Sequence, residues 1–153
     1  MDKLNKQEVE LLRELQKNSR FDINQLTEKL NMSRTSIYDR IKKLESEGYI
    51  TNYVALIDPK KVGLNFIVMV NISLHTQHID YVEEFLVRIR ALDEVVEAFV
   101  TSGTYDVILK VIVQDPERYN DFITHKLSAI PHIRKIQSSF VMRIIKQSNE
   151  LSF

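Results

Sequence analysis

The stretch INQLTEKLNMSRTSIYDRIKKL, residues 23–44, holds two short runs of apolar residues separated by a polar gap. In the first run, which begins at Ile23, the apolar residues follow at three and then four positions, and in the second they follow at four and then three positions. Such intervals place side chains on one face of an α-helix. The stretch therefore predicts two short helices, each with one buried face. The residues on these faces are Leu26, Leu30, Ile37, Ile41 and Leu44.

Polar residues indicate where these helices begin and end. Asp22 and Ser33 each precede a helical run, and their side chains can accept from N–H groups that would otherwise be unpaired. Asn31 tolerates the left-handed conformation of a tight turn between helices, and Gly48 supplies a stop. A helical run also precedes the stretch, with Val9, Leu12 and Leu15 on one face. Three helices with this turn have the spacing of a helix-turn-helix.

A helix-turn-helix presents the start of its second helix to base edges in the major groove, while lysine and arginine contact phosphates. The chain has 21 basic and 21 acidic residues, so attraction to DNA has to come from local charge. Between Ser33 and Leu44, Asp39 alone opposes four basic residues. The alternative interpretation is a three-helix bundle with a solvated, mildly basic face. The turn spacing favours DNA binding over that alternative.

Beyond the helices, residues 49–57 have an extended pattern, which Asp58 and Pro59 close with turn chemistry. A helix-turn-helix followed by a strand is the winged variant. We therefore predict three regions: a DNA-binding domain over residues 1–50, an extended linker or wing strand over 51–64, and a second domain over 65–153.

The second domain is predicted to alternate strands and helices in the order βαββαβ. This is the ferredoxin-like, α+β arrangement, an antiparallel sheet with both helices on one face. Its predicted strands are Phe66–Leu74, Val95–Thr101, Val107–Val113 and Ile136–Ile145, and its helices carry Val82, Phe85, Leu86 and Ile89, then Tyr119, Phe122, Ile123, Leu127 and Ile130 before Pro131. The first and third strands are apolar on both faces, whereas one helical layer covers only one. We therefore expect a second subunit to cover the open face.

Composition excludes several classes of protein. The chain has no cysteine, which removes disulfides, thiolate metal sites and cysteine nucleophiles. It shows no signal-peptide pattern and no long apolar run, so a cytoplasmic protein without a membrane segment is expected. His75 and His78 have no third ligand nearby in the sequence, so no metal site is predicted. The side chains of Glu83-Glu84 and of Asp93-Glu94 point apart because they are adjacent in sequence, so no carboxylate pair for catalysis is predicted.

The turn SGTYD, residues 102–106, is a candidate ligand site. Gly103 would let the backbone approach a ligand closely, exposed N–H groups would receive a carboxylate, and Asp106 would accept from an ammonium group. The simpler interpretation is a hairpin in which Gly103 supplies a positive φ, and the residues alone favour it.

The whole chain resembles the Lrp/AsnC family, also called feast/famine regulators. The resemblance rests on LTEKLNMSRTSIYDRIKKLESEGYITNY, the link IDPKKVGLN, the motif VTSGTYDVILKV and the ending VMRIIKQSNEL, in that order. Asn31 departs from the pattern, since the family more often has glycine there. The resemblance implies a transcriptional regulator, with no cofactor, whose dimers assemble into octamers or other higher oligomers and bind an amino acid between dimers.

The resemblance also implies which residues form the two sites. The DNA-binding candidates are Ser33, Arg34, Thr35, Ser36, Tyr38, Asp39 and Arg40 for bases or their edges, and Lys42 and Lys43 for phosphates. The effector-binding candidates are Val100, Gly103, Thr104, Tyr105, Asp106, Pro116, Ser139, Phe140 and Val141. The leading prediction is a DNA-binding regulator with an amino-acid-sensing domain. Three alternatives to it remain open: an effector-independent oligomeric DNA-binding regulator, a ferredoxin-like enzyme, and a sensor that acts on another protein.

Overall fold

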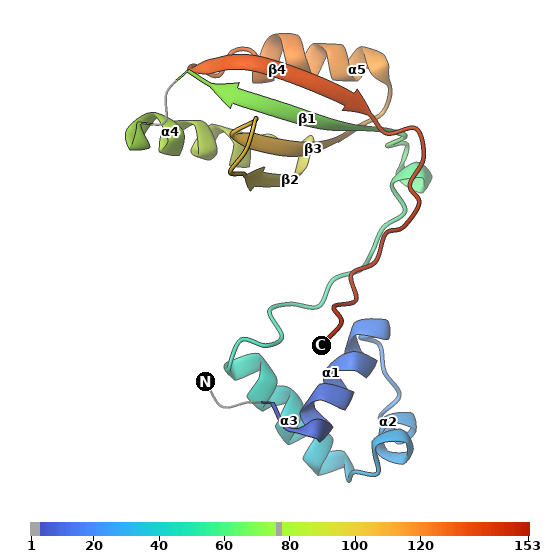
Figure 1. Ribbon diagram of the computed structural model, residues 1–153. Helices are drawn as coiled ribbons and strands as arrows, with labels where there is room; N and C mark the ends of the chain where they lie inside the picture. The colour runs from blue at the N-terminus through green and yellow to red at the C-terminus, as the bar shows by residue number, and fades with distance from the viewer. Residues whose placement is uncertain (1–3, 76–77) are drawn as a thin grey trace. The chain divides into compact units, whose positions relative to one another are not determined.

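The computed structural model describes residues 4–75 and 78–153, so the start of the first predicted domain lies outside the described residues. The chain forms two compact units (Figure 1). A helical unit extends to Leu56 and also includes Lys146–Phe153, and a sheet unit spans Ile57–Ile145. The prediction places all residues after 64 in the second domain. The C-terminal segment instead contacts helix α1, where Gln16 Nε2 donates to the Leu151 carbonyl over 3.2 Å and the Leu151 amide donates to Gln16 Oε1 over 2.6 Å.

The three predicted helices of the helical unit are confirmed as α1, Lys6–Lys17, α2, Ile23–Leu30, and α3, Arg34–Ser46. Their caps follow the expected chemistry. Asp22 accepts from the Asn24 amide over 2.8 Å, and Ser33 accepts from the Ser36 amide over 3.2 Å. Asn31 adopts the left-handed conformation, with φ of 50°. The turn between α2 and α3 therefore needs no glycine.

Helix α3 ends in a Schellman motif. Gly48 has φ of 76°, and its amide donates to the Glu45 carbonyl over 3.1 Å. The Tyr49 amide donates to the Leu44 carbonyl over 2.9 Å. The predicted strand after Gly48 is not formed within this chain, because residues 50–58 make no ladder with any described segment. Only the 3₁₀-helix η1, Pro59–Val62, interrupts this extended connection before the sheet.

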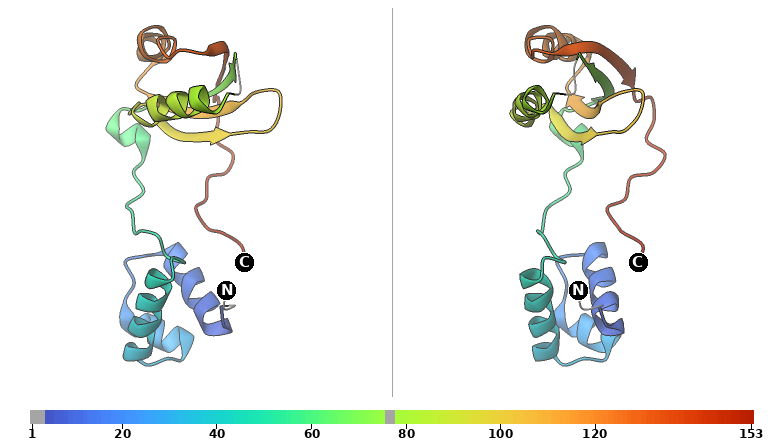
Figure 2. Two further views of the ribbon diagram at one scale, coloured as in Figure 1. Left: turned by 90° about the vertical axis from the view of Figure 1, so that its left-hand side faces the viewer. Right: turned by 60° about the vertical axis from the view of Figure 1, so that its left-hand side comes forward.

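The sheet unit has the predicted βαββαβ order: β1, Phe66–Leu74; α4, Ile79–Arg90; β2, Val95–Val100; β3, Val107–Val113; α5, Pro116–Asp121, continued by η2, Phe122–Leu127; and β4, Ile133–Phe140. The strand order is β2-β3-β1-β4, and every neighbouring pair is antiparallel. Both helices cover the same face of the sheet (Figure 2). The ferredoxin-like prediction is confirmed.

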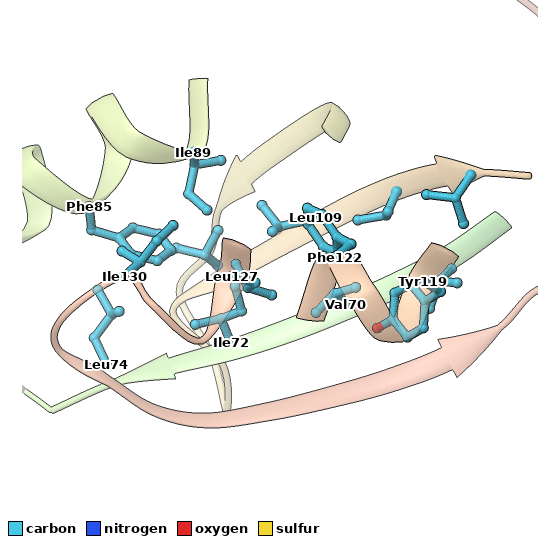
Figure 3. Packing of buried hydrophobic residues seen from close by; sticks show 14 residues of the cluster. Val70, Ile72, Leu74, Phe85, Ile89, Leu109, Tyr119, Phe122, Leu127 and Ile130 are labelled. Atoms are coloured by element: carbon cyan, nitrogen blue, oxygen red, sulfur yellow. The ribbon is translucent and has the colours of Figure 1, made fainter. Parts of the chain in front are cut away.

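The core of the sheet unit lies between this sheet face and the two helices (Figure 3). Phe85 and Ile89 from α4 meet Phe122 and Leu127 from η2, and all four are at most 2% exposed. The sheet contributes alternate residues of β1 and β3, as a period of two requires. These residues are Val68, Val70, Ile72, Val107, Leu109 and Val111.

Three elements of the sheet unit differ from the prediction, and β2 does so only by ending at Val100 instead of Thr101. Strand β4 begins and ends earlier than the predicted Ile136–Ile145, because its pairing with β1 runs from Ile133 to Phe140. The second helix is not uniformly α-helical. Its last turns, η2, are π-helical, with the Ser128 amide donating to the Ile123 carbonyl five residues back over 2.9 Å.

The other face of the sheet is not covered within the sheet unit. It carries Ile67 and Met69 from β1, Ile108 and Ile112 from β3, and Phe99 from β2, which is 51% exposed. An apolar surface of this kind is typical of an interface. The predicted second subunit on this face remains a prediction.

Candidate DNA-binding and ligand-binding sites

Helix α3 presents one exposed stripe opposite its buried residues. Its members lie at positions i, i+3, i+4 and i+7, so they line one side of the helix. Tyr38 is the largest of them and is 49% exposed. Next to the stripe, at the start of the helix, the Arg34 guanidinium donates to Asn24 Oδ1 of α2, and Ser33 is the N-cap. We call Thr35, Tyr38, Asp39 and Lys42 the α3 stripe.

Two other DNA-binding candidates contact helix α1 instead. Arg40 is half-buried, donating through Nη2 to Gln7 Oε1 over 2.6 Å and through Nη1 to Ser36 Oγ over 3.2 Å. Lys43 Nζ donates to Glu8 Oε1 over 2.8 Å. Arg40 and Lys43 therefore hold α3 against α1, and Ser36 accepts from Arg40 within α3. Sequence reasoning missed this role, since the charge pattern of α3 does not show which side of the helix meets α1.

Glu8 is the centre of that contact. Its side chain is 5% exposed, and it accepts from Lys43 Nζ and from the Asn5 amide, the latter over 2.8 Å in a capping box. The hydrogen bond from Lys43, followed by that from the Asn5 backbone, lowers the pKa of Glu8 below its ordinary value of 4.5. Glu14 has a similar arrangement, because Lys29 and Lys17 lower its pKa.

These shifts predict that the helical unit loses stability in acid. A carboxyl whose pKa is lowered by folding stabilises the folded state above its unfolded value of 4.5, and that contribution disappears as the pH falls through the lowered pKa. Thermal unfolding between neutral pH and pH values below 4.5 should show a smaller loss of stability for Glu8→Gln than for the wild type. Glu10→Gln controls for the loss of one negative charge. Identical pH profiles for wild type and Glu8→Gln would rule out this contribution.

The second site concerns the loop between β2 and β3. The loop is closed by Thr101, whose amide donates to the Asp106 carbonyl over 2.9 Å and whose hydroxyl donates to the Tyr105 carbonyl over 2.6 Å. The Asp106 carboxylate accepts from the Leu74 amide over 2.8 Å, where the register of β1 and β4 shifts. Asp106 therefore anchors the loop to the sheet, in addition to any contact with a ligand ammonium.

Tyr105 anchors the same loop on the open face of the sheet. Its hydroxyl donates to Gln137 Oε1, and Lys135 Nζ lies 5.9 Å from its ring centroid. The tip of the loop, Ser102 to Thr104, is exposed. The predicted positive φ at Gly103 is wrong, since the described left-handed glycines are Gly48 and Gly63. A Cβ at Gly103 would meet no atom of this chain within 4 Å, so nothing in the chain itself requires glycine there.

The remaining effector candidates are divided between the two ends of the sheet. Val100 ends β2 beside the loop, whereas Pro116 begins α5 beyond the opposite end of β3. Strand β3 runs from Val107 to Val113 between these ends. At 3.3 Å per residue, the two ends of the strand are about 20 Å apart. Phe140 and Val141 lie at the Pro116 end, with the Phe140 ring 5.2 Å from Phe66 and 5.9 Å from Tyr119. One chain therefore does not bring the nine residues together.

Between the two ends, Ser139 pairs with Met69 and is exposed on the open face. Ser139 is adjacent to Phe140 and Val141 at the end of β4. The Val141 amide continues the pairing with β1 by donating to the Ile67 carbonyl over 3.0 Å. Hence the loop residues form one group, and the end of β4 together with Pro116 forms another. A pocket that uses both groups needs two copies of the chain.

Comparison with known proteins assigns both units. Residues 4–51 match the winged helix-turn-helix DNA-binding family, and residues 67–151 match the Lrp/AsnC ligand binding domain. The chain belongs to the Lrp/AsnC family of transcriptional regulators. As a member of this family it is a DNA-binding regulator with a ligand-binding domain, and not an enzyme.

Relatives in this family align over nearly their whole length. The leucine-responsive regulatory protein of Escherichia coli K12 is 32% identical over 141 residues, which cover 92% of this chain and 86% of that protein. The solved structure of an AsnC family regulator from Agrobacterium tumefaciens is 34% identical, with a TM-score of 0.92 and 97% of each chain covered. A Neisseria meningitidis regulator solved in complex with L-methionine is 29% identical, with a TM-score of 0.93 and coverage of 98% of this chain and 97% of that chain.

None of the helices within residues 4–75 and 78–153 of this Lrp/AsnC protein is long and apolar enough to cross a bilayer. Over the same residues, no group of three or more His, Asp or Glu side chains is arranged to hold a metal ion.

Proposed function

We propose that this protein is a sequence-specific regulator that reads duplex DNA through the α3 stripe. Support comes from the exposure of Thr35, Tyr38, Asp39 and Lys42 on one side of a helix whose opposite side is packed. Arg34 and Ser33 extend the surface at the N-terminal end of α3, the end that a helix-turn-helix directs at base edges. Arg40 and Lys43 act mainly by holding α3 against α1, and Ser36 by positioning Arg40.

The ligand of the sheet unit is an amino acid bound between copies of the chain. Two observations support this proposal. The Neisseria relative was solved with L-methionine, and the candidate residues of this chain fall into two groups that only two copies can bring together. The open space around Gly103 gives the second copy or the ligand room to approach the loop. In such a pocket, the exposed loop amides receive the carboxylate, and Ser139 and Phe140 shape the space for the side chain.

The functional assembly is a homodimer that associates further into an octamer or another higher oligomer. The open face of the sheet offers one apolar interface. The extended segment offers a second, because Val54, Leu56 and Ile57 are 64%, 75% and 65% exposed and residues 50–58 have no strand partner within the described chain. A ligand that bridges copies changes how the copies associate, and thereby changes the spacing of their α3 helices. The ligand can shift the equilibrium between two assemblies only by the difference in its affinity for them. The protein acts in the cytoplasm on double-stranded DNA.

Thermal unfolding in the presence of each of the twenty amino acids tests this function. A ligand that binds only the folded state adds about 2.7 kcal/mol at a hundredfold excess over its dissociation constant. We expect a shift of several degrees with one or a few amino acids, and no such shift in Tyr105→Ala. No shift with any amino acid would contradict ligand binding and favour the second candidate, an effector-independent oligomeric DNA-binding regulator.

A further inference from the structure

A hollow of about 580 Å³ opens in the sheet unit beside the α5–η2 helix. The start of β2, the end of β3 and the helix surround it, together with Leu64 from the segment before β1. The hollow includes none of the nine effector candidates discussed above. We call it the Glu94 pocket, and its charged and histidine side chains are Glu94, Arg118, Asp121, His125 and Lys126.

Glu94 gives the pocket an unused buried acceptor. Its Oε1 accepts from Lys126 Nζ over 2.5 Å, and its backbone carbonyl accepts from the Ile112 amide over 3.0 Å, which ties it to β3. Its Oε2 is buried and has no hydrogen-bond partner among the residues that the structure describes. A buried carboxylate oxygen without a donor is unfavourable. A bound molecule with a strong donor, such as an ammonium group, would satisfy it.

The rim of the pocket carries positive charge. Arg118 Nη1 lies 3.5 Å from Asp121 Oδ2, and its side chain is 65% exposed, so this ion pair leaves most of the guanidinium accessible. The side chain of Lys126 is 51% exposed above Glu94. The unpaired Glu94 Oε2 and the exposed Arg118 guanidinium offer one bound molecule an acceptor and a donor of opposite charge, which favours a ligand that carries both charges.

The backbone beside the pocket has an uncommon helical conformation. The segment η2, Phe122–Leu127, is π-helical, and it contributes Phe122, His125 and Lys126 to the lining. π-helical turns are uncommon and occur frequently at functional sites. The apolar pattern of this segment predicts an ordinary α-helix, so the widened turn is a feature of the folded unit.

We propose that the Glu94 pocket binds a small zwitterion, with its ammonium group donating to Glu94 Oε2 and its carboxylate accepting from Arg118. This is a second ligand site, separate from the loop between β2 and β3. It lies within one copy of the sheet unit, so it requires neither the proposed oligomer nor the proposed effector site.

Nuclear magnetic resonance of His125 tests the proposal locally. The imidazole signal of His125 is assigned by its absence from His125→Gln, and the full-length protein is titrated with glycine, β-alanine, 4-aminobutanoate and 6-aminohexanoate, whose charges stand progressively further apart. A saturable shift with at least one of them is expected. Binding should be at least about tenfold weaker in Glu94→Gln and in Arg118→Gln, because each loses one charge-assisted contact. Glu117→Gln, a neighbour outside the pocket, should bind as the wild type does.

Three results would overturn the proposal. The first is the absence of a saturable shift with any of the four compounds, and the second is an unchanged affinity in Glu94→Gln. The third is an equal response to butylamine or butanoate, which would show that one charge suffices. The two proposals fail separately, because Glu94→Gln should keep the part of the thermal shift that the loop site gives, whereas Tyr105→Ala should lose that part and keep the His125 response with any shift that the Glu94 pocket gives.

Discussion

Replacing Ile37 by alanine is expected to lower the free energy of unfolding of the helical unit by about 2 to 5 kcal/mol and to abolish DNA binding with it. Ile37 is 0% exposed at the centre of the cluster that joins the three helices. Its truncation leaves a cavity beneath the first turns of α3, the part of the helix that carries the α3 stripe. Thermal unfolding followed by circular dichroism, together with fluorescence anisotropy of a labelled duplex, measures both effects.

The neighbouring residue provides the matched control. Tyr38 is 49% exposed, so Tyr38→Ala should leave the free energy of unfolding within about 0.5 kcal/mol of the wild type. It should nevertheless weaken DNA binding, because it removes the largest side chain of the α3 stripe. Unchanged DNA binding by Tyr38→Ala, or wild-type stability in Ile37→Ala, would contradict the assignment of buried and DNA-facing sides.

The two adjacent lysines are expected to behave differently, although the sequence presents them as a pair. Lys42 belongs to the exposed α3 stripe, whereas Lys43 donates to the buried Glu8 carboxylate. Lys42→Ala should weaken binding to all duplexes and make the slope of log affinity against log salt shallower by about 0.9, the contribution of one phosphate contact. Lys43→Ala should leave that slope nearly unchanged and lower the free energy of unfolding by about 1 to 3 kcal/mol, because Glu8 loses a buried partner.

Salt titrations of both variants at one temperature, below the unfolding of either, separate these outcomes. Equal changes in slope for the two lysines would mean that Lys43 also reaches the phosphates. An unchanged slope in Lys42→Ala would remove Lys42 from the interface.

Features that depend on neighbours in sequence could be predicted well. Helix starts at Asp22 and Ser33 follow from cap chemistry. β1 and β3 have the predicted bounds, because each is a short, mostly apolar run bounded by polar or turn residues. The βαββαβ order follows from the same periodicities. These signals depend only on residues that are close in sequence, so the sequence of a single chain is sufficient to find them.

Features set by pairing and packing could not be predicted. The apolar residues after Phe140 continue a strand-like pattern, but the register with β1 ends β4 there. The pairing of β4 with β1 begins at Ile133, just after His132. His132 has φ of 70°, and its carbonyl accepts from the His75 amide over 2.9 Å. No local pattern indicates that the C-terminal segment packs on α1, or that η2 widens into a π-helix.

The candidate sites were located only in part. For DNA, the sequence predicts α3 as the reading helix, and the structure forms that helix, but the division of its polar residues between the α3 stripe and the contact with α1 depends on Gln7 and Glu8, thirty residues upstream or more. For the effector, the resemblance supplied residues from both ends of one sheet. Their separation becomes visible only when the strand register is known, and it indicates a pocket shared between copies.

Selection from a pool of random duplexes tests the central claim most directly. The protein and its Thr35→Ala/Tyr38→Ala variant are each incubated with the pool, and the bound sequences are read after several rounds. If the α3 stripe reads bases, the wild-type protein enriches a defined motif, and the variant, folded to the same extent, enriches a degenerate motif or none. Equal enrichment of the same motif by both proteins, or no enrichment by the wild type, would contradict sequence-specific recognition through α3.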